Sequence, residues 1–233
     1  MTLGTSGDYS VQRDRGVSPR FYRGLGLGMH CTLEYRLAVW RFQSTFSVDG
    51  NAITASSRPI RSFDLDGVIL SIYTHSEAER RLKAHGRWSL WGGLGNGIRW
   101  LVGYNSQFSN ASVGLGRLYE ATLHLRCAWE HGPWMAWGKG VVAPIGVWKR
   151  PGYAYVDNYT SGGDEIDNFT GEYQKNATWL PHIAWEAGIE RQLGNGNAIG
   201  IVYQWDLLTT HQSGCWQYDG VRHGIHFNFR MAF

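Results

Sequence analysis

The chain has 233 residues, about the size of one domain, with 43% hydrophobic residues and a formal net charge of +3. Its mean hydropathy is −0.32, and the absence of any run of about 18 apolar residues excludes a transmembrane helix. The charge is weak and forms no basic stripe interleaved with aromatic residues, which argues against a nucleic-acid partner. We therefore expect residues 1–233 to form a single domain in which apolar and polar residues alternate.

The first residues carry no recognisable signal. Positions 1–10 lack a basic segment followed by an apolar core, so a secretory signal peptide is not expected in this chain. For an exported protein this indicates a mature form with an added initiator Met. The segment 1–21 shows no clear periodicity, and the sequence leaves its structure open.

Alternation begins in the region 22–48. Across 25–39 the odd positions are mostly apolar, whereas the even positions include Gly24, Gly26 and Gly28. The apolar phase then shifts between Val39 and Trp40. This region is therefore either one very long strand with a bulge or two strands joined by a turn.

Seven more alternating segments and a closing strand follow. They lie near 62–73, 86–94, 98–105, 113–129, 134–148, 178–193, 197–207 and 223–233. In the closing strand, Phe227, Phe229 and Phe233 share the apolar face. Several segments reach the 9 to 11 residues, roughly, that a strand needs to cross a bilayer. Because closure without an edge favours an even number, we predict ten strands, with eight or twelve as alternatives.

The connections differ in length. Short turns are predicted at 95–97 (Gly-Asn-Gly), 130–133 and 194–196 (Gly-Asn-Gly), and long polar stretches at 74–86, 106–112, 149–177 and 208–220. Short turns at one end and long loops at the other are typical of outer-membrane barrels, with the long loops outside. We predict an all-β, antiparallel transmembrane β-barrel in the bacterial outer membrane, with short periplasmic turns and long extracellular loops.

These strands, and the terminal Phe233, resemble the bacterial outer-membrane β-barrel class over the whole chain. That resemblance implies lipid and lipopolysaccharide as surroundings, and recognition of the last strand by the barrel-assembly machinery. The stretches at 104–106 (Tyr-Asn-Ser) and 109–112 (Ser-Asn-Ala-Ser) are similar to uncharacterised barrels of Bacteroidetes.

In the clearest strands the even-numbered residues point into the lumen. The polar members of this set are Glu34, Arg36, Glu120, His124, Arg126, His182, Glu186, Glu190, Gln204, Asp206, His226 and Arg230. Both signs occur in similar numbers, so in a narrow barrel we expect these groups to pair and fill the lumen. The alternative is a charged conduit that selects a solute, which a twelve-stranded barrel would favour. Gly24, Gly26 and Gly28 leave room for a cavity, or else permit curvature or close packing.

One pair of residues could carry catalysis. If the strand before them continues, His211 and Ser213 share the lipid-facing side, where a His can activate a Ser nucleophile. The spacing resembles the His-x-Ser of the outer-membrane phospholipase and lipid A deacylase families. Those families have Asn after Ser, whereas this chain has Gly214. The orienting third group stays unassigned, with Asp219 and Asn176 as candidates.

Two outer features suggest surface contacts. The loop 149–177 gathers carboxylates and aromatic residues, and its length favours a role in binding a protein or glycan. Its spacing matches no calcium loop, and we assign neither a metal nor a cofactor. Arg117 interrupts an apolar face near the outer interface, where it could contact lipopolysaccharide phosphates.

From the sequence we expect a non-enzymatic barrel with a polar, largely filled lumen. Its outer loops would serve surface recognition or an accessory role in a membrane complex. Two alternatives stay open: a small-solute pore, and a lipid hydrolase that uses His211 and Ser213.

Overall fold

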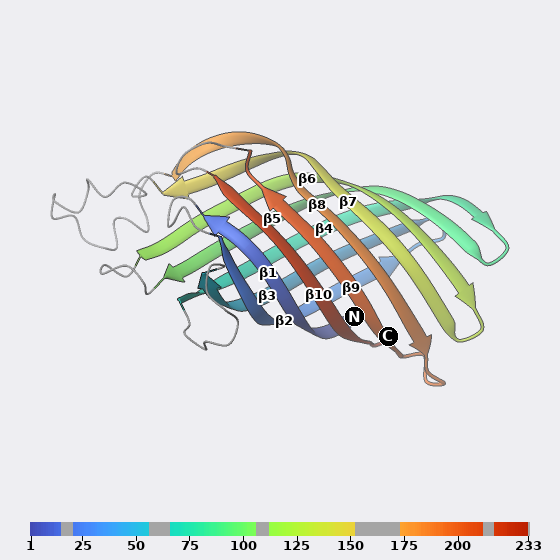
Figure 1. Cartoon of the computed structure of the whole chain (residues 1–233). Helices are drawn as coiled ribbons and strands as arrows, with labels where there is room; N and C mark the ends of the chain where they lie inside the picture. Colours follow the sequence, from blue (N-terminus) through green and yellow to red (C-terminus); the bar gives the residue numbers. More distant parts are fainter. Residues whose placement is uncertain (15–20, 56–65, 106–111, 152–172, 212–216, 233) are drawn as a thin grey trace, which may run out of the picture.

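The computed structural model describes residues 1–14, 21–55, 66–105, 112–151, 173–211 and 217–232 as a closed barrel of ten antiparallel strands (Figure 1). The strands are β1 (Thr2–Asp14), β2 (Tyr22–Arg36), β3 (Trp40–Ala55), β4 (Gly67–His85), β5 (Trp88–Asn105), β6 (Ser112–His131), β7 (Trp134–Pro151), β8 (Tyr173–Gln192), β9 (Ala198–Thr209) and β10 (Tyr218–Arg230). Among the described residues there is no helix with the length and apolar character needed to cross a membrane.

Closure comes from the pairing of the first strand with the last. Each strand pairs with its neighbour in the sequence, and β1 pairs with β10 from Thr2 opposite Arg230 to Asp14 opposite Tyr218. The backbone N–H of Met231 extends this ladder by donating to the carbonyl of Met1. Because the ring closes, no strand edge is left without a hydrogen-bonded partner strand.

Period-two alternation separates the two faces of the wall. On β2, Leu25, Leu27 and Met29 are 70%, 77% and 69% exposed on the outside. On β1, Ser6 and Asp8 point inward and are buried. The exterior is thus apolar and the interior polar, as a barrel in lipid requires. Near the termini the outer face also carries an apolar groove of about 750 Å³.

The two ends of the barrel differ. The tight connections at 37–39, 86–87, 132–133 and 193–197, together with both chain termini, lie at one end, on the right of Figure 1. The five connections at the other end contain the segments 15–20, 56–65, 106–111, 152–172 and 212–216, which the structure does not describe. This asymmetry is the one predicted, and by the rule for outer-membrane barrels the tight turns face the periplasm. We call the end with the termini the inner end.

The predicted number of ten strands is confirmed, although two errors in the boundaries offset each other. The segment 1–21, left open by the sequence, contains β1, whereas the predicted strands 86–94 and 98–105 are one strand, β5. The region 22–48 holds two strands, because backbone hydrogen bonds between Leu37 and Trp40 close a turn there. The closing strand runs from Tyr218 to Arg230, and Phe233 lies outside the described residues.

The predicted turn at Gly95-Asn96-Gly97 is wrong, and the reason lies in the lumen. These residues sit in the middle of β5. A Cβ atom on Gly95 would lie 2.7 Å from the Ser76 carbonyl oxygen and 2.7 Å from Thr122 Oγ1, and one on Gly97 would lie 2.8 Å from a Glu120 oxygen. Glycine is needed here for close approach rather than for a positive φ.

The predicted long loop at 74–86 is also wrong. β4 continues to His85, and only Gly86, with a φ of 58°, and Arg87 form the turn. The outward residues Thr74, Ser76 and Ala78 are small, and two of them are polar, which obscured the alternation. The other predicted long loops, 106–112, 149–177 and 208–220, do span the outer connections, with strands extending into their margins.

Substitution at neighbouring positions of β5 tests the inward role of its glycines. We expect Gly95→Val to lower the free energy of unfolding by about 1–3 kcal/mol or more, because the added atoms overfill the lumen. The control Asn96→Leu, on the exposed outer face, should fold at least as well as the wild type. Urea unfolding in detergent micelles, followed by tryptophan fluorescence, measures both. Equal effects of the two substitutions would contradict this assignment.

Candidate functional site

The lumen is filled in layers, and the layer nearest the outer loops is apolar. Its members are Leu101, Leu118, Trp148, Leu208 and Tyr218, all buried and packed together. They come from the outer ends of β5, β6, β7, β9 and β10, so they meet across the barrel. A second cluster, Tyr22, Ile53 and Ala55, lies beside β4 residue Ile69 at the same end. Both clusters therefore place apolar side chains at the outer end of the lumen.

Below the apolar layer lies a network of charged side chains centred on His182. Its Nδ1 is 2.9 Å from a Glu120 oxygen, and its Nε2 is 3.1 Å from Asp206 Oδ1. Arg99 Nη2 donates to Asp206 Oδ2 at 2.9 Å. The four side chains come from β5, β6, β8 and β9, and each is at most 5% exposed. Each charge is therefore balanced by a partner on another strand.

Further side chains extend this network across the barrel. Tyr73 OH donates to Glu120 Oε1 at 2.9 Å, and the Arg99 guanidinium lies 4.6 Å from the centre of the Tyr73 ring. Arg222 donates to Asp49 Oδ2 at 2.7 Å and to Asp206 Oδ2 at 3.3 Å. The partition formed in this way connects residues of β3, β4, β5, β6, β8, β9 and β10.

A second ionic group is centred on Glu77. Lys139 Nζ lies 2.5 Å and His124 Nδ1 lies 2.8 Å from Glu77 Oε2. The His75 and His124 rings stack, and Thr122 Oγ1 lies 3.2 Å from His75 Nε2 and 2.6 Å from His124 Nε2. His75, Glu77 and His124 could together ligate a metal ion, since their ligand atoms lie within 4.8 Å of one another. The Lys139 ammonium already neutralises Glu77, so we assign these residues to the ionic network.

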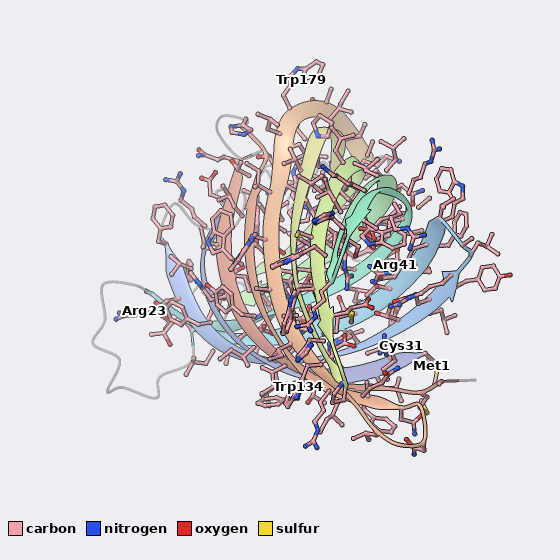
Figure 2. The ribbon with its side chains drawn as sticks, turned by 90° about the vertical axis from the view of Figure 1, so that its right-hand side faces the viewer. Met1, Arg23, Cys31, Arg41, Trp134 and Trp179 are labelled. Carbon is pink, nitrogen blue, oxygen red and sulfur yellow. The ribbon has the colours of Figure 1, made fainter. Side chains whose placement is uncertain are left out.

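The third ionic group lies toward the inner end. Arg41 donates to Glu79 Oε2 at 3.0 Å and to Glu34 Oε2 at 2.9 Å, and Glu34 also pairs with Arg36. Figure 2 views the barrel from this end: side chains occupy the interior, whereas Trp179 points away from the wall.

Two cavities lie on opposite sides of the partition. A vestibule of about 140 Å³ reaches from the inner end to Asp49, His75 and Lys139. A smaller cavity of about 40 Å³ is lined by Asn51, Arg99, Asp206 and Tyr218. Arg222 lines both cavities, so its side chain is part of the wall between them. The larger cavity thus opens at the inner end, and Arg222 separates it from the smaller one.

The even-numbered residues predicted to line the lumen do face the lumen. Glu120, His124, Arg126, His182 and Asp206 are buried there. Those nearer the inner end, namely Glu34, Arg36, Glu186, Glu190, Gln204, His226 and Arg230, line the vestibule. The room beside Gly26 and Gly28 is taken by the side chains of Asn51 and Asp49, so close packing explains these glycines.

Sequence reasoning missed the inward residues with odd numbers. Those that join the ionic groups are Arg41, Asp49, Tyr73, His75, Glu77, Glu79, Arg99 and Lys139, on β3, β4, β5 and β7. The alternation Tyr73, His75, Glu77, Glu79 was readable, but it fell in the segment interpreted as a loop. Lys139 was not predicted because the inward positions of β7 change from odd to even numbers at an irregularity between Ala143 and Ile145.

The other predicted site residues lie at the outer end. β9 ends at Thr209, so His211 follows the strand instead of continuing its lipid-facing phase, and its φ is 50°. Ser213 lies outside the described residues, as does most of the loop 149–177. Arg117 is half-buried on the outward face of β6, opposite Lys149, whose Nζ lies 4.5 Å from the Tyr119 ring.

The barrel is similar to a solved outer-membrane structure. The outer-membrane protease OmpT from Escherichia coli superposes with a TM-score of 0.59 at 8% identity, over 100% of this chain and 95% of that one. The chain has the fold of a bacterial outer-membrane β-barrel. The β domain of the Bordetella autotransporter BrkA gives a TM-score of 0.40 at 11% identity, over 99% of this chain and 98% of the other. No protein-family model and no curated protein sequence matches this chain.

Two aspartates distinguish buried pairing from pairing at the rim. Asp206 is 2% exposed and contacts Arg99, His182 and Arg222, whereas the side chain of Asp219 is 25% exposed and pairs with Arg13. We expect Asp206→Asn to lower the free energy of unfolding by about 3–5 kcal/mol, because it leaves buried cations without their counter-charge. Asp219→Asn should cost less than about 1 kcal/mol. Urea unfolding in micelles measures both, and comparable losses would contradict a buried network.

Proposed function

We propose that this protein is a non-enzymatic outer-membrane barrel with a closed lumen, which acts through its two ends rather than by conducting solutes. The observation that supports this most directly is the double barrier in the lumen. Trp148 and Leu118, with 1% and 0% exposure, stand in the apolar layer, and the Arg99–Asp206 pair stands in the ionic partition below it. An ion would have to break buried salt bridges and then cross an apolar layer.

The small-solute pore is the competing function, and conductance separates the two. We expect purified wild type in planar lipid bilayers to show no unitary conductance. The variant Arg99→Ala, Asp206→Ala, Trp148→Ala removes a charge pair together with the largest buried side chain of the outer layer, and it should conduct. A control with Trp134→Ala, Trp179→Ala and Arg191→Ala changes outward residues and should stay silent. Steady conductance by the wild type would overturn the closed-lumen proposal.

The outer end is where we propose that recognition takes place. Five of the nine connections between consecutive strands are at this end, and the segment between Pro151 and Tyr173 is the longest. Long connections carried by a rigid barrel are suited to binding a protein or glycan, or to an accessory role in a membrane complex. At the inner end, the closing strand that leads to Phe233 would serve as the signal for the barrel-assembly machinery.

Lipopolysaccharide is the proposed lipid partner of the outer rim. Arg117 and Lys149 are cross-strand neighbours on β6 and β7, on the outward face near the outer end. Two cations at this depth can bind phosphate groups in the headgroup region.

A paired substitution tests this contact. We expect Arg117→Ala with Lys149→Ala to weaken lipopolysaccharide binding by about tenfold or more, since one hydrogen bond to a charged group is worth about 1.5–3 kcal/mol. Arg191→Ala, at the inner end beside Trp134, is the matched control and should bind like the wild type. Binding can be measured by surface plasmon resonance on immobilised lipopolysaccharide. Unchanged affinity of the double variant would rule out this site.

A further inference from the structure

We propose that the vestibule at the inner end binds a small organic monocarboxylate on the guanidinium of Arg126. Arg126 is 5% exposed and lines the vestibule. Within the described part of the chain its one assigned contact is with the Trp137 ring, whose centre lies 4.3 Å from the guanidinium carbon. No carboxylate of the described residues lies within salt-bridge distance of it.

The acids that act most strongly on Arg126 are already paired. The groups that act on it electrostatically are Arg41, Glu79, Glu34 and Glu190. Glu79 and Glu34 are bound by Arg41, and Glu190 lies 3.4 Å from Arg230. Lys139, directly opposite Arg126 on β7, is held by Glu77. The acids near Arg126 therefore have their own cations.

Arg126 is the arginine at this end that has no carboxylate of its own. Arg36 and Arg41 bind Glu34, Arg41 also binds Glu79, and Arg230 pairs with Glu190. Glu186 also lines the vestibule, but among the described residues no carboxylate pairs with Arg126. A buried cation without a close counter-charge is costly, and a carboxylate ligand bound to the guanidinium would lower that cost.

The shape of the site favours a carboxylate. Trp137 covers one face of the guanidinium and leaves its N–H groups to form the two parallel hydrogen bonds that a carboxylate accepts. The vestibule measures about 140 Å³, and a cavity of roughly 150 Å³ is known to hold benzene. Acetate is smaller than benzene and fits this volume, whereas the larger benzoate fits because the vestibule is open at the inner end and need not enclose the whole ring. Either ligand would enter from the periplasmic side past Thr2 and Arg36.

Calorimetric titration of the refolded barrel in detergent micelles tests the proposal, with sodium benzoate, acetate, inorganic phosphate and chloride as probes. We expect saturable binding of benzoate, weaker binding of acetate, and none of chloride. Arg126→Gln should weaken benzoate binding by about tenfold or more. Arg126→Lys should give an intermediate affinity, because lysine keeps the positive charge but cannot donate the two parallel hydrogen bonds of a guanidinium. Arg230→Gln, in the same vestibule but paired with Glu190, should bind within about twofold of the wild type.

Three results would overturn the proposal: no saturable binding of either carboxylate by the wild type, binding of phosphate without carboxylates, or an equal loss in Arg126→Gln and Arg230→Gln. Heat-dependent migration on gels verifies that each variant folds. Should Arg126→Gln not fold, the indole N–H signal of Trp137 in the wild type, assigned with Trp137→Phe, gives a second measurement. It should shift on addition of benzoate, and an unmoved signal would also overturn the proposal. Conductance plays no part in this test, so its outcome is independent of whether the lumen is closed.

Discussion

The need to neutralise charged side chains inside a narrow lumen governs the architecture of this protein. A ten-stranded barrel leaves an interior that side chains can fill, and every ionised group placed there loses most of its contact with water. Arg99, His182 and Arg222 reach Asp206 from three different strands, and Lys139 reaches Glu77. His182 and Arg222 lie on the strands next to Asp206, whereas Arg99 reaches it from β5 and Lys139 on β7 reaches Glu77 on β4, so these last two pairs join separate parts of the wall across the lumen. The same contacts that neutralise the charges therefore fill the barrel.

The constraint also dictates where small residues occur. The strands must let the ionic side chains pass, and β5 does so by placing glycine opposite them at Gly95 and Gly97. β2 does the same at Gly28, where Asp49 and Ser6 occupy the space that a side chain would need. An inward glycine in such a barrel thus marks the position of a large or charged side chain on a neighbouring strand. Gly95-Asn96-Gly97 has the composition of a hairpin turn for this unrelated reason.

The alternation of apolar and polar residues, with the lengths of the connections, was enough to predict the class of fold, which end of the barrel carries the long connections, and the inward face of the clearest strands. It failed where one face was ambiguous: the outward Thr74 and Ser76 hid the continuation of β4, and with it His75 and Glu77. Pairing across the lumen was beyond reach for a different reason. The contact between Arg99 and Asp206 depends on the register of the five strands from β5 to β9, and a shift of one residue in any of them would move the partner to the lipid side. Single-strand patterns contain no information on that register.

A buried ionic network differs from a binding site in whether polar atoms remain free to contact a ligand. His182 between Glu120 and Asp206 has the composition of a catalytic group, yet both ring nitrogens are engaged and the residue is 2% exposed, so a substrate has no atom to approach. Arg126 is nearly as buried, but its partner is an aromatic face that leaves the N–H groups directed at a cavity open to one side of the membrane. Burial alone therefore does not decide function in this lumen. A group that is both buried and incompletely neutralised is where a ligand gains most, because it supplies the charge that the strands do not.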